Sequence, residues 1–203
     1  MGFFDWFKRR KPQPQEAVKP QQPEEPLKTE QAQLLEAVQQ DMKVFSHDKA
    51  EWQWDDAFAV YCQQHGVDED WEPTEEEEDI IWSYAGLHIE FFLTWVIKKG
   101  LLSDYHMEDD AEEVAAVVNE EMTGHRFFVE QCDCTLTLDD LSEQLYGFMD
   151  TYYNNNYLDA FSNWLENVRH KPVLGTAFDW ADYHAFEPIL EVAYFKYRMQ
   201  KRK

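Results

Sequence analysis

Between residues 80 and 97 the apolar side chains recur at helical spacing and form two neighbouring stripes. The stripes contain Ile80, Tyr84, Leu87, Phe91 and Thr94, and Ile81, Ala85, His88, Phe92 and Trp95. Two adjacent apolar stripes predict a helix that is buried over most of its circumference. Glu90 interrupts the run, and Lys98 and Lys99 close it well short of about 20 apolar residues, so it predicts a core helix rather than a membrane span. Gly100 is expected to end this helix.

Helical spacing continues along the chain and predicts an all-α fold. Further helices are expected in WQWDDAFAVYCQQHG, EDDAEEVAAVVNEEM, GHRFFVEQ and YLDAFSNWLENV, and from about Trp180 onward. Thr137 with Asp140 is a capping-box arrangement, so another helix is expected to begin there and to break at Asn154–Asn156. We expect at most one minor strand, near residues 173–178. The pattern predicts a single compact domain of about seven or eight helices.

Composition separates a head from the folded part. Residues 1–28 hold five of the eight prolines and are predicted to be disordered, with an aromatic and basic segment at residues 2–11 before a Pro/Gln-rich linker. The helical domain is expected over residues 29–203. Within it, a leading helix at residues 29–47 precedes a core at residues 51–200.

Charge is the most unusual property of the sequence. The chain holds 41 acidic and 18 basic residues, which gives a net charge of −23. Such an acidic protein is repelled by nucleic-acid phosphates and by anionic membranes, because binding to them depends on Lys and Arg. It can attract a basic protein and speed the encounter, although solubility alone also explains an acidic surface.

Recognisable metal and catalytic motifs are missing from the sequence. Cys62, Cys132 and Cys134 do not make a disulfide framework, which favours a reducing compartment, and the start MGFFDWFKRRK does not resemble a secretory signal, so we expect a cytoplasmic protein. Cys132 and Cys134 lack a second ligand pair, and His106 with the acids that follow it lacks calcium-loop spacing. We therefore predict no metal, no cofactor and no enzymatic activity.

Tryptophans surrounded by acids flank the first predicted body helix. Such anchors suit the recognition of a basic protein surface. The candidate partner-binding residues are Trp52, Trp54, Asp55, Asp56, Asp68, Glu69, Asp70, Trp71, Glu72, Glu75 and Glu76. The plainer interpretation is that these tryptophans belong to the core or cover a helix end.

Several short motifs follow one another in a fixed order between residues 52 and 198. They comprise Trp54, Asp55, Asp56 and Ala57; His88, Ile89, Phe92, Leu93 and Trp95; Phe127, Phe128, Cys132 and Asp133; Leu136, Thr137 and Leu141; Tyr152, Tyr153, Tyr157 and Asp159; and Trp180, Tyr183 and Pro188. Through these motifs the chain resembles an uncharacterised family of bacterial cytoplasmic proteins. Glu90 and Cys134 stand where that family favours glycine. The family in turn resembles the small acidic immunity proteins that accompany bacterial toxins, which implies a protein-binding role.

Three hypotheses about function follow. The leading one is an acidic protein-binding module, an immunity protein that neutralises a basic toxin domain by occlusion. The second is an enzyme or small-molecule binder that uses His88 with Asp55 or Asp56, in a pocket that would also include Glu90. The third is an adaptor recruited to a membrane surface by residues 2–11.

Overall fold

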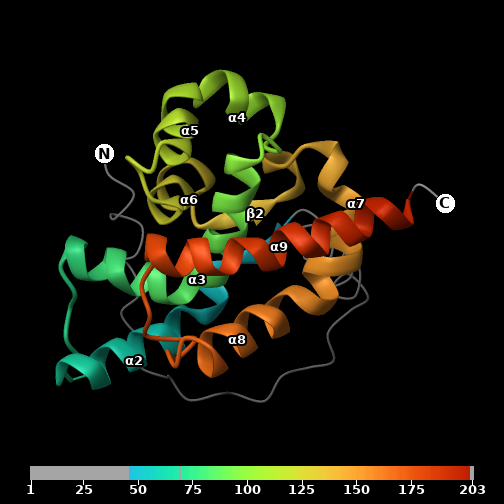
Figure 1. The fold of residues 1–203 in the computed structure, drawn as a ribbon. Helices are drawn as coiled ribbons and strands as arrows, with labels where there is room; N and C mark the ends of the chain where they lie inside the picture. Colours follow the sequence, from blue (N-terminus) through green and yellow to red (C-terminus); the bar gives the residue numbers. More distant parts are fainter. Residues whose placement is uncertain (1–45, 69, 202–203) are drawn as a thin grey trace, which may run out of the picture. The chain divides into compact units, whose positions relative to one another are not determined.

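Helices make up nearly all of the regular structure in the computed structural model, which describes residues 46–68 and 70–201 (Figure 1). The prediction of an all-α fold is confirmed. The expected disordered head at residues 1–28 lies outside the described residues, and so do residues 29–45 of the predicted leading helix. Residues 46 and 47, the end of that predicted helix, belong to a strand instead.

The central element is helix α3 (Glu75–Lys98), and every residue from Ser83 to Ile97 on it is buried. Its first turn is capped by Thr74, whose backbone N–H donates to the Glu77 carboxylate at 2.8 Å. Gly100 ends the helix in the left-handed conformation, with a φ of 64°. By length and composition α3 could cross a membrane, but 89% of its most apolar window is buried inside the protein, as the two-stripe pattern predicts for a core helix.

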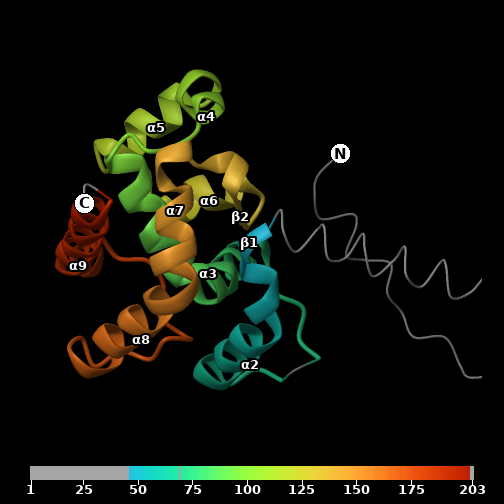
Figure 2. The ribbon, with the colours of Figure 1, turned by 90° about the vertical axis from the view of Figure 1, so that its right-hand side faces the viewer.

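The other elements pack around α3. Those that contact it include β1 (Ser46–Lys49), η3 (Ala50–Gln53), α2 (Trp54–His65), α5 (Ala111–Val118), α6 (Gly124–Cys132) and α9 (Trp180–Gln200). The short helix α4 (Asp104–Asp109) packs on α5. Figure 2 shows α4 and α5 on one side of the domain, with α2 and α8 (Leu158–Asn167) on the opposite side.

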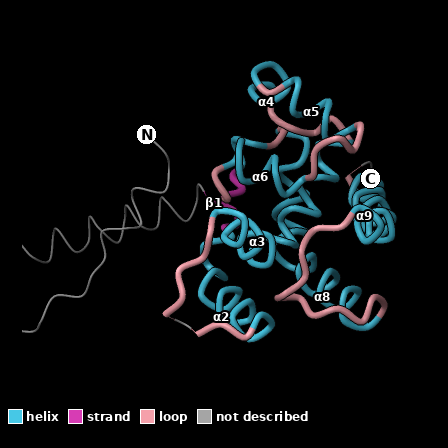
Figure 3. Tube along the Cα trace, turned by 90° about the vertical axis from the view of Figure 1, so that its left-hand side faces the viewer, coloured by secondary structure: helices cyan, strands magenta, loops and turns pink. Residues whose placement is uncertain are grey.

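The small sheet was not predicted, and it overlaps the predicted helices only at residues 46 and 47 and at Thr137. Strand β1 pairs antiparallel with β2 (Thr135–Thr137). Figure 3 draws the strands in magenta. Residues 173–178, the segment proposed as a strand, form a loop. Thr137 does meet Asp140 as a capping box, but only a 3-10 turn, η4 (Leu138–Asp140), follows. The backbone is extended again at Leu141, so the next helix starts later than expected.

That next helix runs without a break through the predicted interruption at Asn154–Asn156. The elements η5 (Glu143–Leu145), α7 (Tyr146–Phe148), the π-helical segment η6 (Met149–Tyr157) and α8 follow one another directly. The Asn155 side chain donates to the Asp150 carbonyl at 2.7 Å, and the Asn156 side chain donates to the Thr151 carbonyl at 3.2 Å. These bonds satisfy backbone groups in the wide turn, which explains why asparagines continue this helix.

Helix α9, the last helix of the chain that the structure describes, packs on α3 and α8. Asp179 caps its start by accepting from the Asp182 N–H at 3.0 Å, and the helix continues through Pro188. Phe186 of α9 meets Phe161 of α8 at 5.3 Å and Phe91 of α3 at 6.0 Å between ring centroids. Edge-to-face contacts of this kind join the three helices in one aromatic core.

Candidate functional site

The acidic end of the domain is formed by η3, the start of α2, the loop before α3 and the first turn of α3. Its exposed acids are Glu51, Asp55, Asp56, Asp68, Asp70, Glu72, Glu75 and Glu76, while Glu69 lies outside the described residues. None of the eight forms an ion pair with another described residue; the exposed carboxylates that do so lie elsewhere, such as Glu120 with Lys98 and Glu130 with Arg126.

The three candidate tryptophans of this end have different environments. Trp52 is 57% exposed. Trp54 is half-buried and packs on Trp82 with ring centroids 4.2 Å apart. Trp71 is half-buried too and stacks on Tyr61 at 5.6 Å. Trp52 is therefore the exposed anchor of the set, whereas Trp54 and Trp71 pack against the body.

His88 has a different carboxylate partner from the one predicted. It is 3% exposed, and its Nε2 lies 3.0 Å from Oδ2 of Asp48 in β1. The same oxygen accepts a hydrogen bond from the Tyr153 hydroxyl at 2.9 Å. Asp55 and Asp56, the partners proposed for it, are exposed on α2. This geometry links the strand to the core helix and the π-helical segment.

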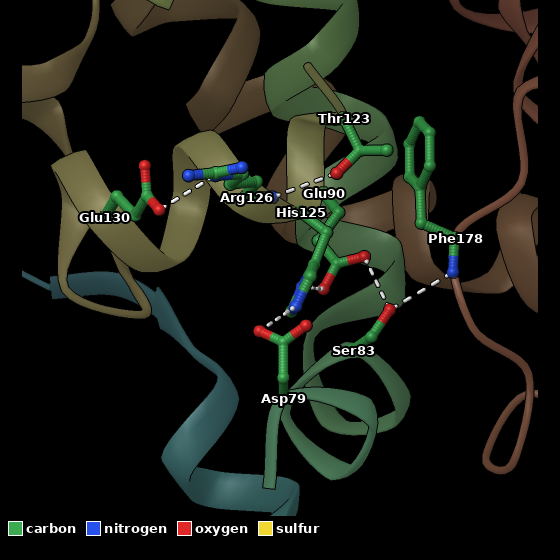
Figure 4. A network of polar contacts seen from close by, with 8 residues as sticks. All are labelled: Asp79, Ser83, Glu90, Thr123, His125, Arg126, Glu130 and Phe178. Carbon is green, nitrogen blue, oxygen red and sulfur yellow. Dashed lines mark hydrogen bonds and ion pairs between the residues drawn. The ribbon is translucent and has the colours of Figure 1, made fainter. Parts of the chain in front are cut away.

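Glu90 is the centre of a buried polar network rather than part of a pocket with His88 (Figure 4). It is fully buried on α3, with its Oε1 2.6 Å from Nδ1 of His125. Its Oε2 accepts from the Ser83 hydroxyl at 3.2 Å, and Ser83 accepts from the Phe178 N–H at 3.1 Å. Nε2 of His125 lies 3.0 Å from Asp79. The network thus joins α3, α6 and the loop before α9.

A glycine permits this close contact between α3 and α6. A Cβ at Gly124 would lie 1.7 Å from the Thr94 hydroxyl oxygen and 3.0 Å from the Glu90 carbonyl oxygen, so a side chain there would push the two helices apart. His125 follows directly and is placed against Glu90. This pairing could not be predicted from the sequence, because the two residues are 35 positions apart and belong to different helices.

Electrostatics keep the imidazole of His125 in this network protonated. Burial raises the pKa of Glu90, because it removes the charged carboxylate from solvent. Burial alone would lower the pKa of His125, but Glu90 and Asp79 outweigh it and raise that pKa to about 10. His125 therefore holds a proton at neutral pH that its imidazole releases more readily in the unfolded chain. We interpret the network as a structural connection, because each of its four side chains (Asp79, Ser83, Glu90 and His125) has a hydrogen-bond partner within it.

A second buried histidine, His106 of α4, also lies between two carboxylates. Its Nδ1 is 2.6 Å from Oδ2 of Asp110, and its Nε2 is 3.0 Å from Oδ1 of Asp140 in η4. Burial lowers the pKa of His106, but Asp140 and Asp110 outweigh it and raise the pKa above the ordinary value. Cys132, at the end of α6, completes a group with His106 and Asp140 whose ligand atoms lie within 4.8 Å of one another. These three residues could hold a metal ion.

An apolar groove of about 670 Å³ lies between the π-helical segment and α9, away from the predicted site residues. Tyr152 and Asn156 line one side of it, and Ile189, Val192 and Lys196 line the other. Sequence reasoning missed this groove because its two walls come from distant segments. Phe195 of α9, which is 64% exposed, lines a separate, smaller groove with Leu101 and Arg198.

The fold and these sites define a small all-α domain with buried histidine–carboxylate pairs and an acidic surface. Residues 67–173 match the family model described as a domain of unknown function (DUF7832), and the chain belongs to that family. Comparisons with curated proteins and with solved structures gave no match. Membership in an uncharacterised family was predicted from the sequence and is confirmed. The matched range includes His88, His106 and His125, whereas Trp52 and α9 lie outside it.

Proposed function

We propose that this protein binds a basic protein surface through its acidic end and acts as a cytoplasmic immunity protein. It would neutralise a toxin domain by covering that domain's cationic active site. The observation that carries the proposal is the unbalanced charge of the acidic end. Residues 50–80 contain twelve acidic residues and no Lys or Arg. Because its eight described exposed acids have no ion-pair partner among the described residues, their field is available to a partner.

Trp52 supports the same proposal. Interfaces draw most of their binding energy from a few anchors, among which tryptophan is enriched, and surrounding polar residues exclude water from them. Trp52 is exposed next to Glu51, and Asp55 and Asp56 are exposed within the following four positions. The acids would steer the basic partner toward the site, and Trp52 would supply the desolvated contact that slows dissociation.

The proposal is tested with the product of the neighbouring gene, by coexpression and by binding kinetics. We expect rescue from toxicity and a complex whose association slows steeply as salt is added. Trp52→Ala should raise the dissociation rate constant by about tenfold or more. The double variant Asp55→Lys, Asp56→Lys should lower the association rate constant by about tenfold or more at low salt.

A matched control carries the same change of charge on another side of the domain. Glu112 and Glu121 are exposed at and after α5. Glu112→Lys with Glu121→Lys should slow association much less than the Asp55, Asp56 pair. Equal effects of the two double variants would mean that net charge alone matters and would reject the acidic end as the interface. Binding without rescue would retain the binding module and reject the immunity role.

A further inference from the structure

We propose that His106, Cys132 and Asp140 form a binding site for a divalent transition-metal ion, best matched by Zn²⁺. Asp110 would be the carboxylate that orients the histidine. The site is independent of the acidic surface and of the proposed partner. It combines one nitrogen, one sulfur and one oxygen donor, a set that zinc accepts.

Three separate elements bring the donors together. His106 lies on α4, Cys132 is the last residue of α6, and Asp140 ends the 3-10 turn η4. Their ligand atoms lie within 4.8 Å of one another, and His106 and Cys132 are buried. Zinc–ligand distances are about 2.0–2.3 Å. An ion at the centre would therefore require only small movements of the side chains toward it.

The donors are held in position by neighbouring groups. Asp110 accepts from Nδ1 of His106 at 2.6 Å, which leaves Nε2 facing Asp140. Metal-binding histidines usually have such a carboxylate on the other ring nitrogen, where it fixes the ring and increases its basicity. Asp140 is fixed as well: its Oδ2 accepts from the Thr137 N–H at 2.7 Å and from the Thr137 hydroxyl at 2.8 Å. Its Oδ1 is thereby directed to His106.

Charge balance favours the loaded site. A Zn²⁺ ion with one thiolate, one carboxylate and a neutral imidazole is electrically neutral, and a neutral group is the least costly to bury. A thiolate ligand and an imidazole select zinc-like ions over Ca²⁺ and Mg²⁺, which prefer oxygen. Three protein ligands leave the fourth tetrahedral position to water.

The metal-free interpretation treats the same geometry as a charged imidazole held between Asp110 and Asp140, with Cys132 as an ordinary buried thiol. The two interpretations differ in the role of sulfur. A structural ion pair does not need the thiol, whereas the metal site binds through it. The test therefore follows the sulfur–metal bond directly.

Cobalt(II) is added to the metal-free full-length protein, and the thiolate-to-cobalt absorption is recorded before displacement by zinc. We expect one equivalent to bind with this absorption. Cys132→Ala should abolish it and weaken zinc binding by at least about tenfold, and Asp110→Asn should keep it while weakening zinc binding by about 10–100-fold. The matched control is Cys134→Ala, because Cys134 is an equally buried thiol outside the metal group. It should bind like the unaltered protein.

A second measurement uses the unaltered protein, so its result does not depend on whether a variant folds. X-ray absorption at the zinc edge of the loaded unaltered protein should show one sulfur at about 2.3 Å. A shell of oxygen and nitrogen alone would overturn the proposal and assign the binding to surface carboxylates. The proposal would also be overturned if no thiolate absorption appeared on adding cobalt, or if the absorption persisted in Cys132→Ala.

Discussion

His125 and His106 are two buried histidines with the same local geometry and different neighbours. In each, Nδ1 lies 2.6 Å from one carboxylate oxygen and Nε2 lies 3.0 Å from another. Around His125, the far oxygen of Glu90 is bonded to the Ser83 hydroxyl. Around His106, the third neighbour within reach is the Cys132 thiol. We infer from this comparison that the group beside a histidine–carboxylate pair sets its chemistry: the Ser83 hydroxyl completes a hydrogen-bond network, whereas the Cys132 thiol would complete the proposed set of metal ligands.

The two histidine sites also differ in how deeply the carboxylate on Nδ1 of the histidine is buried. Glu90 is fully buried, while Asp110 and Asp140 keep 14% and 15% of their side-chain surface exposed. A charge as deep as that of Glu90 is tolerated only with a partner, so the His125 network should contribute to stability through pairing. At the His106 site the two carboxylates reach solvent, while the imidazole itself is 1% exposed.

Removal of Glu90 should have the largest effect. Glu90→Ala leaves His125 buried with one carboxylate and opens a cavity beside Ser83, so the free energy of unfolding should fall by about 3–5 kcal/mol. Urea denaturation at pH 7 measures this loss. The matched control is Glu130→Ala, which removes an exposed partner of Arg126 and should cost less than about 1 kcal/mol. Similar losses in the two variants would show that burial does not distinguish these ion pairs.

Zinc should stabilise the protein through His106 and leave the contribution of His125 unchanged. At free zinc about 100-fold above the dissociation constant, the free energy of unfolding should rise by about 2.7 kcal/mol, because the ion binds the folded state. His106→Gln should abolish this gain, and His125→Gln should keep it. Denaturation with and without zinc in each variant measures the gain separately from any loss caused by the substitution. A gain that survives His106→Gln would place the ion elsewhere.

The sequence predicted the fold better than the sites, for a physical reason. Burial of α3 follows from two apolar stripes within one helix, a local pattern. The pairing of Glu90 with His125, or of His106 with Asp140 and Cys132, depends on how helices pack after folding. Neither Cys132 nor His106 with the acids that follow it matches a metal-binding motif by itself, because spacing along the chain does not reveal that α4 and α6 meet. The strand at residues 46–49 was missed because its partner β2 is distant in sequence.

Loss of the Ser83 hydroxyl should have a smaller effect than loss of Glu90. Ser83→Ala removes the donor to Glu90 and the acceptor for the Phe178 N–H, so the free energy of unfolding should fall by about 2 kcal/mol. Ser162→Ala is the control, since Ser162 is half-buried and its side chain has no hydrogen-bond partner among the described residues. It should change stability by less than about 0.5 kcal/mol. Equal losses would mean that the hydroxyl does not complete the network.

The smallest effect is a slope in stability against pH, to which both histidines contribute. Each has a folded-state pKa above its unfolded value of 6.5, so the folded protein binds more protons than the unfolded chain above that pH. Their stabilisation is therefore complete below pH 6.5 and is lost as the pH rises toward the folded pKa, which is about 10 for His125. Each histidine contributes a slope of at most about 1.4 kcal/mol per pH unit.

Denaturation between pH 6.5 and about 7.5, a unit below the ordinary cysteine pKa of about 8.5, keeps the unfolded cysteines protonated while this slope is measured. His125→Gln should reduce it, and zinc should reduce the remainder, because the metal-bound His106 no longer takes up a proton. His184→Gln removes an imidazole that is 45% exposed and serves as the control. An unchanged slope in His125→Gln would mean that Glu90 does not raise the pKa of His125. The two histidine sites would then differ in their protonation as well as in the neighbouring hydroxyl or thiol.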